Sequence, residues 1–496
     1  MGIVIRQSFW SSALIYIGVA FGYVNTLILL PYFMDIEHVG LVRLIQSNGM
    51  ILLPVVVLGL NGSYIKFYPQ FKENITEKHK QFSMQIVSIL LASLVFCILI
   101  YLFQDQIRSL FEEKSELYND YIFASLVILV SQALFNYLIA VVWSEYNITI
   151  PNFLNEVALR SMVFACILLY GFKVVDFGDF ILLVLFSYTS ITVILYLVLI
   201  IKYEFRFNWK FYTLDINWLK KNFGFGSYTM LITTCSSIVA NVSYLLTSSM
   251  VGLEANGILI ISVFISTIIE LPKRVITQII SPFITQNFND KKLENINKDY
   301  QRSSINLGLI SLLLGIGIIT NLEDLFLTIP KGDVLSTGFT VIVILGFARV
   351  FSMISSISAE ILTYSEYYRL NIIVTIATAV IIIGLNFLLI PQYGIVGAAL
   401  SIFISNVFSN GAKMLILFSK YHFSPFVKEH IYLILISFLA FSVAYYLPYK
   451  FEPVINILVR SVVTAIVFLT LCLWFKISLE VNNLLNKALG ILKRIR

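Results

Sequence analysis

The chain alternates long apolar runs with short polar breaks along its whole length of 496 residues. A helix needs about 20 apolar residues to cross the hydrocarbon core of a bilayer. The pattern therefore predicts an all-α membrane protein with fourteen membrane-spanning helices. Their expected ranges are 9–31, 38–65, 82–104, 119–143, 152–173, 179–202, 225–250, 256–284, 303–328, 336–364, 370–390, 394–419, 429–448 and 453–476.

The polar breaks between these runs are short. Charge collects in some of them, whereas turn residues separate the runs at Ser144–Pro151 and Pro391–Gly394. The charged breaks are Lys72–Gln81, Asp105–Asp120, Lys202–Lys221 and Asn287–Arg302. Because no polar stretch exceeds about 25 residues, we expect no soluble domain.

The composition agrees with a lipid environment. Hydrophobic residues make up 58% of the chain and charged residues 12%, whereas a soluble domain carries about 25% charge. The four cysteines, which lie in apolar runs, read as small buried hydrophobes without metal-ligand spacing. We expect no metal and no cofactor. The net charge of +6 is scattered between the spans, so we expect no nucleic-acid partner.

The distribution of basic residues predicts the orientation of the chain. With the N-terminus in the cytoplasm, the inside segments carry 22 Lys and Arg residues and the outside segments carry 5. This bias follows the positive-inside rule. Both termini are therefore predicted to be cytoplasmic, and the tail from Lys476 to Arg496 is predicted to be a basic amphipathic helix on the inner leaflet.

Two pairs of short segments indicate an internal repeat. Ile36–Gly40 and Leu253–Gly257 share Glu and Gly three residues apart at an offset of 217, and Ser-Glu-Tyr recurs at 144–146 and 365–367 at an offset of 221. Parallel six-helix units related by an axis along the membrane normal enclose a cavity in many transporters. The expected parts are lobes 1–202 and 225–419, the linker 203–224, helices 13 and 14 at 420–476, and the cytoplasmic tail 477–496.

Local motifs carry a family resemblance. Pro391–Ala399 reads as a turn into span twelve, Tyr23–Asn25 lies in span one, and Gly40 opens span two. With fourteen spans and short outer loops, the chain resembles the O-antigen and capsule flippases of the multidrug/oligosaccharidyl-lipid/polysaccharide exporter superfamily. The resemblance implies V-shaped lobes with alternating access in the bacterial inner membrane. It implies an undecaprenyl-pyrophosphate-linked oligosaccharide as cargo, membrane lipids as partners, and a glycan polymerase as a candidate partner.

Ionisable residues at membrane depth are costly and are candidates for function. Arg349 and Glu270 fall near the midplane of spans ten and eight. The predicted substrate-binding residues are Arg349, Arg43, Lys273, Arg274, Asn25 and Asn241, and the predicted coupling carboxylates are Glu270 and Glu360. Fixed cations in a low-dielectric cavity would attract a pyrophosphate, and a carboxylate there would couple transport to protons or sodium ions.

Each of these residues could instead have a purely structural role. Arg349 has an interlobe ion pair as its alternative, and Glu270 has a one-turn pair with Lys273 or Arg274. Glu360 lies eleven residues after Arg349, about 16 Å along one helix and on the same side of it. The basic residues expected to reach an interface are Arg160, Lys413 and Arg460. The asparagines expected to join helices or line the cavity are Asn25, Asn48, Asn241, Asn406 and Asn410.

The sequence favours a transporter without covalent chemistry. A membrane sugar polymerase or ligase would need acid and base groups in a sizeable outer loop, and the largest outer loop expected here is Gln104–Asn119. A drug or cation antiporter of the same fold is the other alternative. Such antiporters usually have twelve spans and acidic lobe interiors, so the basic bias and two extra spans favour the flippase.

Overall fold

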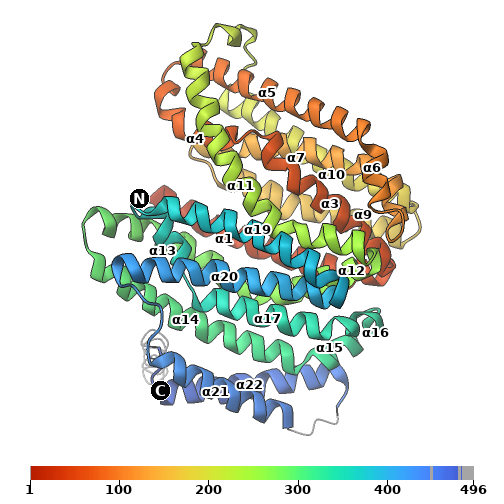
Figure 1. Ribbon diagram of the computed structural model, residues 1–496, viewed down its shortest axis with the longest axis vertical. Helices are drawn as coiled ribbons and strands as arrows, with labels where there is room; N and C mark the ends of the chain where they lie inside the picture. The colour runs from red at the N-terminus through yellow and green to blue at the C-terminus, as the bar shows by residue number, and fades with distance from the viewer. Residues whose placement is uncertain (1, 447–450, 479–481, 483–496) are drawn as a thin grey trace, which may run out of the picture. The chain divides into compact units, whose positions relative to one another are not determined.

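The computed structural model describes residues 2–446, 451–478 and 482, and all regular structure in these ranges is helical (Figure 1). Fourteen helical segments of this part are long and apolar enough to cross a membrane. The predicted count of fourteen spans is therefore confirmed. The chain is a multi-pass integral membrane protein.

The elements up to the middle of the chain are α1 (Gly2–Tyr23), η1 (Val24–Leu29), α2 (Leu30–Phe33), α3 (Ile36–Val56), α4 (Leu60–Phe71), α5 (Ile75–Leu102), α6 (Gln104–Ser109), η2 (Glu116–Asp120), α7 (Ile122–Ser144), α8 (Thr149–Asn152), η3 (Phe153–Ala158), α9 (Leu159–Gly171), α10 (Phe177–Tyr203), η4 (Trp209–Thr213), α11 (Ile216–Met250) and α12 (Leu253–Thr267).

The remaining elements are η5 (Ile268–Glu270), α13 (Leu271–Asn289), α14 (Leu293–Thr320), α15 (Leu322–Thr328), α16 (Gly332–Leu335), η6 (Ser336–Gly338), α17 (Phe339–Ile354), α18 (Ser358–Tyr364), α19 (Tyr368–Tyr393), α20 (Ile395–Tyr421), α21 (Glu429–Tyr446) and α22 (Pro453–Trp474).

The chain folds into two compact units. Unit 1 contains Met1–Ile260 and Ile383–Ile395, and unit 2 contains Ile261–Ile382 and Val396–Arg496. The expected six-helix lobes and their boundaries stay a prediction. The predicted amphipathic tail falls almost entirely outside the described residues.

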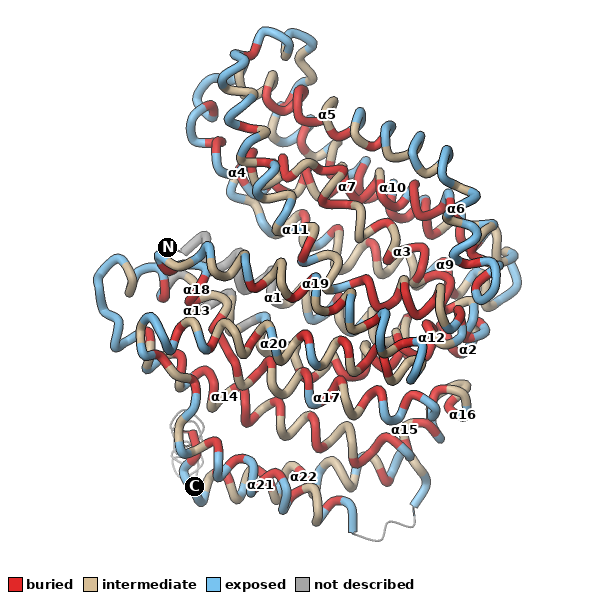
Figure 2. The backbone as a smooth tube through the Cα atoms, in the orientation of Figure 1, coloured by how far each residue is buried: buried red, intermediate tan, exposed pale blue. Residues whose placement is uncertain are grey.

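Unit 1 is built around α7, which is the most buried of the fourteen spans, with 72% of its apolar window inside the protein (Figure 2). It packs against α3, α4 and α10, while α11 packs along α3 and α4. The fully buried rings of Tyr64 and Tyr137 meet edge to face in this core. By contrast, only 22% of the corresponding window of α5 is buried, so most of its apolar side chains are left for lipid.

Unit 2 is built around α14, which packs against α17, α21 and α22. One of its apolar clusters joins α14 to spans thirteen and fourteen through Leu309, Leu433 and Phe468. At one end of α22, Arg460 donates to Asp324 of α15 at 2.9 Å. The ion pair gives Arg460 a partner within unit 2, and its expected approach to an interface stays a prediction.

Two apolar runs expected as single helices are broken. The run 38–65 divides at Leu58 and Gly59, both with positive φ (55° and 62°), into α3 and α4. A Cβ at Gly59 would collide with the carbonyl of Gly226 on α11, so this position requires glycine. The run 336–364 divides between α17 and α18, where Ser356 has φ of 52°.

The first pair of repeat segments lies within unit 1, and its two members pack on each other. A Cβ at Gly40 would collide with the carbonyl of Leu253, and a Cβ at Gly257 would collide with the carbonyl of Ile36. Asn256 Nδ2 also donates to the Gly40 carbonyl at 3.0 Å. Such reciprocal contacts are typical of a two-fold relationship. They support the internal repeat, which otherwise stays a prediction.

Candidate functional site

An ion pair joins the two midplane residues of unit 2. Arg349 on α17 donates to Glu270 Oε2 at 2.7 Å, and Ser352 Oγ, one turn further on, donates to Glu270 Oε1 at 2.7 Å. Glu270 ends the short 3₁₀ segment η5, which interrupts the eighth span. A 3₁₀ segment within a longer helix often marks a hinge or a functional site. This ion pair joins two helices of unit 2, whereas the structural alternative for Arg349 was an ion pair between the two lobes.

Lys273 lies one turn after Glu270 but bonds elsewhere. Its Nζ donates to the carbonyl of Ser352 at 2.8 Å and contacts Ser352 Oγ at 3.3 Å. Pro272 precedes it in the first turn of α13, where proline is tolerated because the N–H of this turn lacks a helical acceptor. Arg274 is exposed. Arg349 is the hydrogen-bonded partner of Glu270, whereas Lys273 interacts with Glu270 electrostatically.

The break between α17 and α18 changes the expected geometry of Glu360. Because the helix stops at Ile354 and restarts at Ser358, the expectation that Arg349 and Glu360 share one side of a continuous helix is wrong. Glu360 still interacts electrostatically with Lys273 and with Lys413 of α20. One carboxylate oxygen of Glu360 is buried and has no hydrogen-bond partner among the described residues.

These five groups, Glu270, Lys273, Arg349, Glu360 and Lys413, form what we call the unit 2 charge cluster. It holds three cationic side chains against two carboxylates, so it keeps a surplus of positive charge. The charged neighbours of Lys413 belong to unit 2, and its expected approach to an interface stays a prediction. The neighbouring Asn410 accepts from Ser355 Oγ at 3.1 Å and donates to Asn406 at 2.8 Å, which joins α20 to the break.

Arg43 is a partly buried cation of unit 1. It lies seven residues into α3, about 10 Å from the beginning of the helix. Its guanidinium carbon sits 4.4 Å from the ring centroid of Tyr244 on α11, and its Nε is buried without a hydrogen-bond partner. Among the described residues no carboxylate pairs with Arg43. A ring face stabilises this cation without neutralising it.

Asn25 and Arg160 meet where two spans contain a π-helical turn. Asn25, in η1, donates to the Arg160 carbonyl at 3.0 Å. The Arg160 guanidinium pairs with Glu156 of η3 at 2.8 Å and donates to the Gly18 carbonyl. Arg160 makes these bonds within unit 1 with 31% of its side chain exposed, and its expected approach to an interface stays a prediction. Single π turns occur frequently at functional sites, and the Asn25 side-chain oxygen is buried without a partner in the described part of the chain.

Of the other predicted asparagines, one bonds within its own helix and one joins two segments of unit 1. Asn241 donates to the Ser237 carbonyl one turn back in α11 at 3.0 Å, and Asn48 of α3 donates to the Tyr118 hydroxyl at 2.7 Å. All four cysteines are unpaired, and the described residues contain no cluster suited to a metal ion. Sequence reasoning missed Ser352 and Tyr244, because a serine and a tyrosine in apolar helices carry no local sign of these contacts.

Comparison with known proteins identifies the family. Residues 4–288 match the model of the polysaccharide biosynthesis protein family. This match covers more than half of the chain, so the chain belongs to that family. The resemblance to the polysaccharide flippase branch is thereby confirmed. A search among curated proteins finds no match.

Solved structures share the fold. The lipid II flippase MurJ in an inward closed conformation is 16% identical, with 95% of this chain and 98% of that chain covered and a TM-score of 0.74. An inward-facing multidrug resistance MATE family transporter is 14% identical, with coverage of 83% and 94% and a TM-score of 0.64. A MOP superfamily transporter from Pyrococcus furiosus is 13% identical, with coverage of 85% and 95% and a TM-score of 0.56. The fold is that of the MOP superfamily of membrane transporters.

Proposed function

We propose that this protein is a flippase that moves an undecaprenyl-pyrophosphate-linked oligosaccharide from the inner to the outer leaflet by alternating access. Membership of the polysaccharide biosynthesis family supports a glycan cargo. The observation that carries the proposal is the uncompensated positive charge at membrane depth. Among the described residues Arg43 contacts an aromatic ring and no carboxylate, and the unit 2 charge cluster holds more cations than carboxylates.

The cargo headgroup explains this charge. A pyrophosphate brings about two negative charges, and an Arg fork binds such oxygens in a bidentate way. We assign Arg43 and Lys273 as its first contacts. Arg43 has no carboxylate partner in the described structure, and the Lys273 ammonium makes its hydrogen bonds to Ser352, while Glu270 and Glu360 act on it electrostatically. Arg274, which is exposed, adds long-range attraction. Asn25 and Asn241 remain predicted contacts for the sugar.

The ion pair of Glu270 with Arg349 suggests how coupling works. While Glu270 is ionised, it holds Arg349 at 2.7 Å. When a proton or sodium ion binds Glu270, the carboxylate loses its charge and Arg349 becomes available to the pyrophosphate. Glu360, with its unpartnered oxygen, is a second site for the coupling ion. Cation binding and cargo binding in unit 2 are thereby linked through a single pair of side chains.

The proposal also covers the membrane, the orientation and the partner of the protein. We infer that it lies in the bacterial inner membrane with both termini in the cytoplasm, and that a glycan polymerase receives the cargo on the other side. The alternatives are a drug or cation antiporter and a membrane sugar polymerase or ligase. A cationic drug would be repelled by Arg43 and by the surplus charge of unit 2, so the sign of the charge favours the anionic cargo.

Reconstitution separates these functions. Purified protein in proteoliposomes would receive a fluorescent lipid-linked oligosaccharide in one leaflet, and a membrane-impermeant quencher would report its passage. The proposal predicts transfer of this lipid and no efflux of a cationic dye in matched vesicles. Efflux of the dye without lipid transfer would establish the antiporter, and extension of the glycan chain would establish the enzyme.

A further inference from the structure

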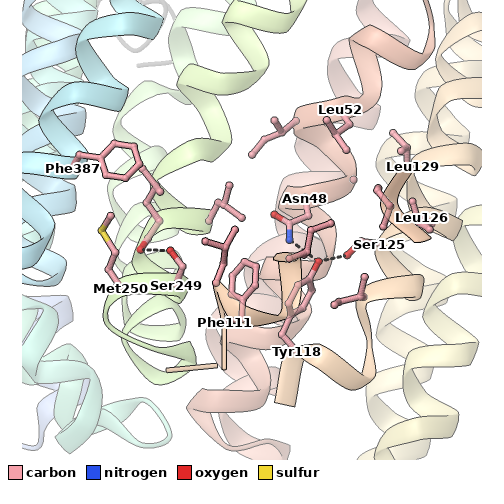
Figure 3. Close-up of a pocket in the computed structure, with 18 residues that line it drawn as sticks. Asn48, Leu52, Phe111, Tyr118, Ser125, Leu126, Leu129, Ser249, Met250 and Phe387 are labelled. Atoms are coloured by element: carbon pink, nitrogen blue, oxygen red, sulfur yellow. Dashed lines mark hydrogen bonds between the residues drawn. The ribbon is translucent and has the colours of Figure 1, made fainter. Parts of the chain in front are cut away.

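Unit 1 contains an apolar cavity of about 510 Å³ enclosed by α3, α5, α6, α7, α11 and the unit 1 part of α19 (Figure 3). Leu52 and Leu129 line one side of it, and Met250 and Phe387 line the other. Binding pockets for organic ligands commonly have volumes of roughly 300–1,000 Å³. The wall is nearly all hydrocarbon, so the cavity suits an apolar ligand.

Hydrogen bonds hold in place the connection between α5 and α7 that closes one end of the cavity. Phe111, Ser115 and Tyr118, from the connection between α5 and α7, are all buried. Ser115 Oγ donates to the Ser248 carbonyl of α11 at 2.6 Å. The Tyr118 hydroxyl accepts from Asn48 Nδ2 at 2.7 Å and lies 3.2 Å from Ser125 Oγ. These bonds tie the connection to three different helices, so the pocket is preformed.

The cavity opens beside exposed apolar side chains. Ile100 and Leu110 line it from α5 and the end of α6, and Leu110 is 65% exposed. An apolar space left empty loses dispersion contacts on its whole lining. A cavity of about 150 Å³ binds one benzene, so this one has room for roughly three such rings, on the order of 15–20 carbon atoms. One hydrocarbon chain from the bilayer fits this size.

An acidic hollow adjoins the cavity on the same connection. It is lined by the carboxylates of Glu37, Glu112, Glu113, Glu116 and Asp120, and by two basic side chains, Arg108 and Lys114. The side-chain oxygen of Asn119, which also lines it, is buried without a partner in the described residues. The hollow therefore offers acceptors and negative charge in excess, with two cations among them.

We propose that this cavity and hollow bind a zwitterionic membrane phospholipid with a primary amine, such as phosphatidylethanolamine. Its acyl chain fills the cavity, its ammonium group meets the carboxylates, and its phosphate lies near Arg108 and Lys114. The same excess of carboxylates repels a polyprenyl pyrophosphate, so this site does not take the proposed cargo. The inference is independent of the transport proposal, because it rests on a different part of unit 1.

Photo-crosslinking tests the site on the unaltered protein. The chain would be reconstituted in vesicles of phosphatidylethanolamine and phosphatidylglycerol with a trace of phosphatidylethanolamine that carries a diazirine on its acyl chain. We expect adducts at the cavity wall around Leu52, Phe111 and Leu129, and competition by added phosphatidylethanolamine but not by phosphatidylglycerol. Adducts elsewhere, equal competition by both lipids, or stronger labelling of the wall by a prenyl pyrophosphate probe would each overturn the proposal.

Two variants distinguish binding of the lipid's acyl chain from binding of its headgroup. The triple substitution Glu112→Gln, Glu113→Gln and Glu116→Gln should lower labelling on the order of tenfold. This estimate assumes that each exposed carboxylate contributes to binding as a typical exposed ion pair does. A matched control neutralises three exposed acids elsewhere, Glu73→Gln, Asp215→Asn and Glu294→Gln, and should leave labelling unchanged. Leu52→Trp should block the cavity while the protein elutes as wild type in size exclusion. Unchanged labelling in the triple variant would refute the role of the acidic hollow.

Discussion

Removing the guanidinium of Arg349 gives the sharpest test of the unit 2 charge cluster. The Arg349 and Glu270 side chains are 19% and 24% exposed and their charged atoms are 2.7 Å apart. Breaking a buried ion pair typically costs about 3–5 kcal/mol, because one charge is left without compensation. Since about a fifth of each side chain stays exposed and Ser352 still donates to Glu270, we expect Arg349→Ala to lower stability by about 2–3 kcal/mol.

Charge-neutral variants separate the structural role of Arg349 from its role toward the cargo. Arg349→Met combined with Glu270→Gln removes both charges, so stability should return to within about 1 kcal/mol of wild type. Export should remain absent in this double variant, because the cargo contact is still missing. Arg349→Lys should keep part of the export activity, since a point charge attracts pyrophosphate although the bidentate fork is lost.

Unfolding in mixed micelles and glycan export in cells supply the two measurements. Membrane fractions would establish that each variant inserts and accumulates as wild type does. We expect Arg349→Ala and Glu270→Gln, each made alone, to lower stability, and the double variant to recover it. Neither Arg349→Ala nor the double variant should export glycan. Wild-type export by Arg349→Ala would refute the assignment of Arg349 to the cargo, and wild-type stability of Glu270→Gln would refute the energetic weight of the ion pair.

Three further predictions concern topology, lipid and unit 1. Reporter fusions should read cytoplasmic after Glu77, Trp209 and Asn295 and periplasmic at Glu113 and Lys331, and any fusion on the opposite side would contradict the fourteen-span topology there. A photoreactive prenyl probe should label α21 and α22, the apolar spans outside the predicted repeat, whereas label confined to spans three to six would count against a tail groove at that place. Arg43→Ala should reduce lipid-linked glycan transfer at least tenfold while Tyr244→Phe, which keeps the ring face, should leave it near wild type; equal transfer by both variants would remove Arg43 from the site.

The spans could be predicted from the sequence because the bilayer fixes both their length and their polarity. The interruptions were harder to predict. The division at Leu58 and Gly59 depends on the close approach of α4 to α11, and the division at Ser356 depends on a positive φ at a residue that rarely adopts one. Hydrophobicity continues across both breaks, so an apolar run alone does not reveal them.

The unit 2 charge cluster could likewise be predicted only in part from the sequence. The cost of charge at membrane depth was enough to single out Arg349 and Glu270 as residues that need partners. Their pairing depends on the packing of η5 against α17, which lie 79 positions apart in the chain. Arg460 gives a second example of a partner that only the fold reveals. Its position near a helix end favoured an interface, and only the fold brings Asp324 within 2.9 Å of it.

The dependence of transport on headgroup charge is the decisive test of whether cations at membrane depth recognise the cargo. The same oligosaccharide would be attached to the same prenyl chain through a pyrophosphate or through an uncharged ether, and transfer of each would be measured in proteoliposomes containing the wild-type protein. If cations at membrane depth recognise the cargo, the pyrophosphate lipid should cross rapidly and the ether lipid should cross no faster than in protein-free vesicles. Equal transfer of the two lipids would contradict the account.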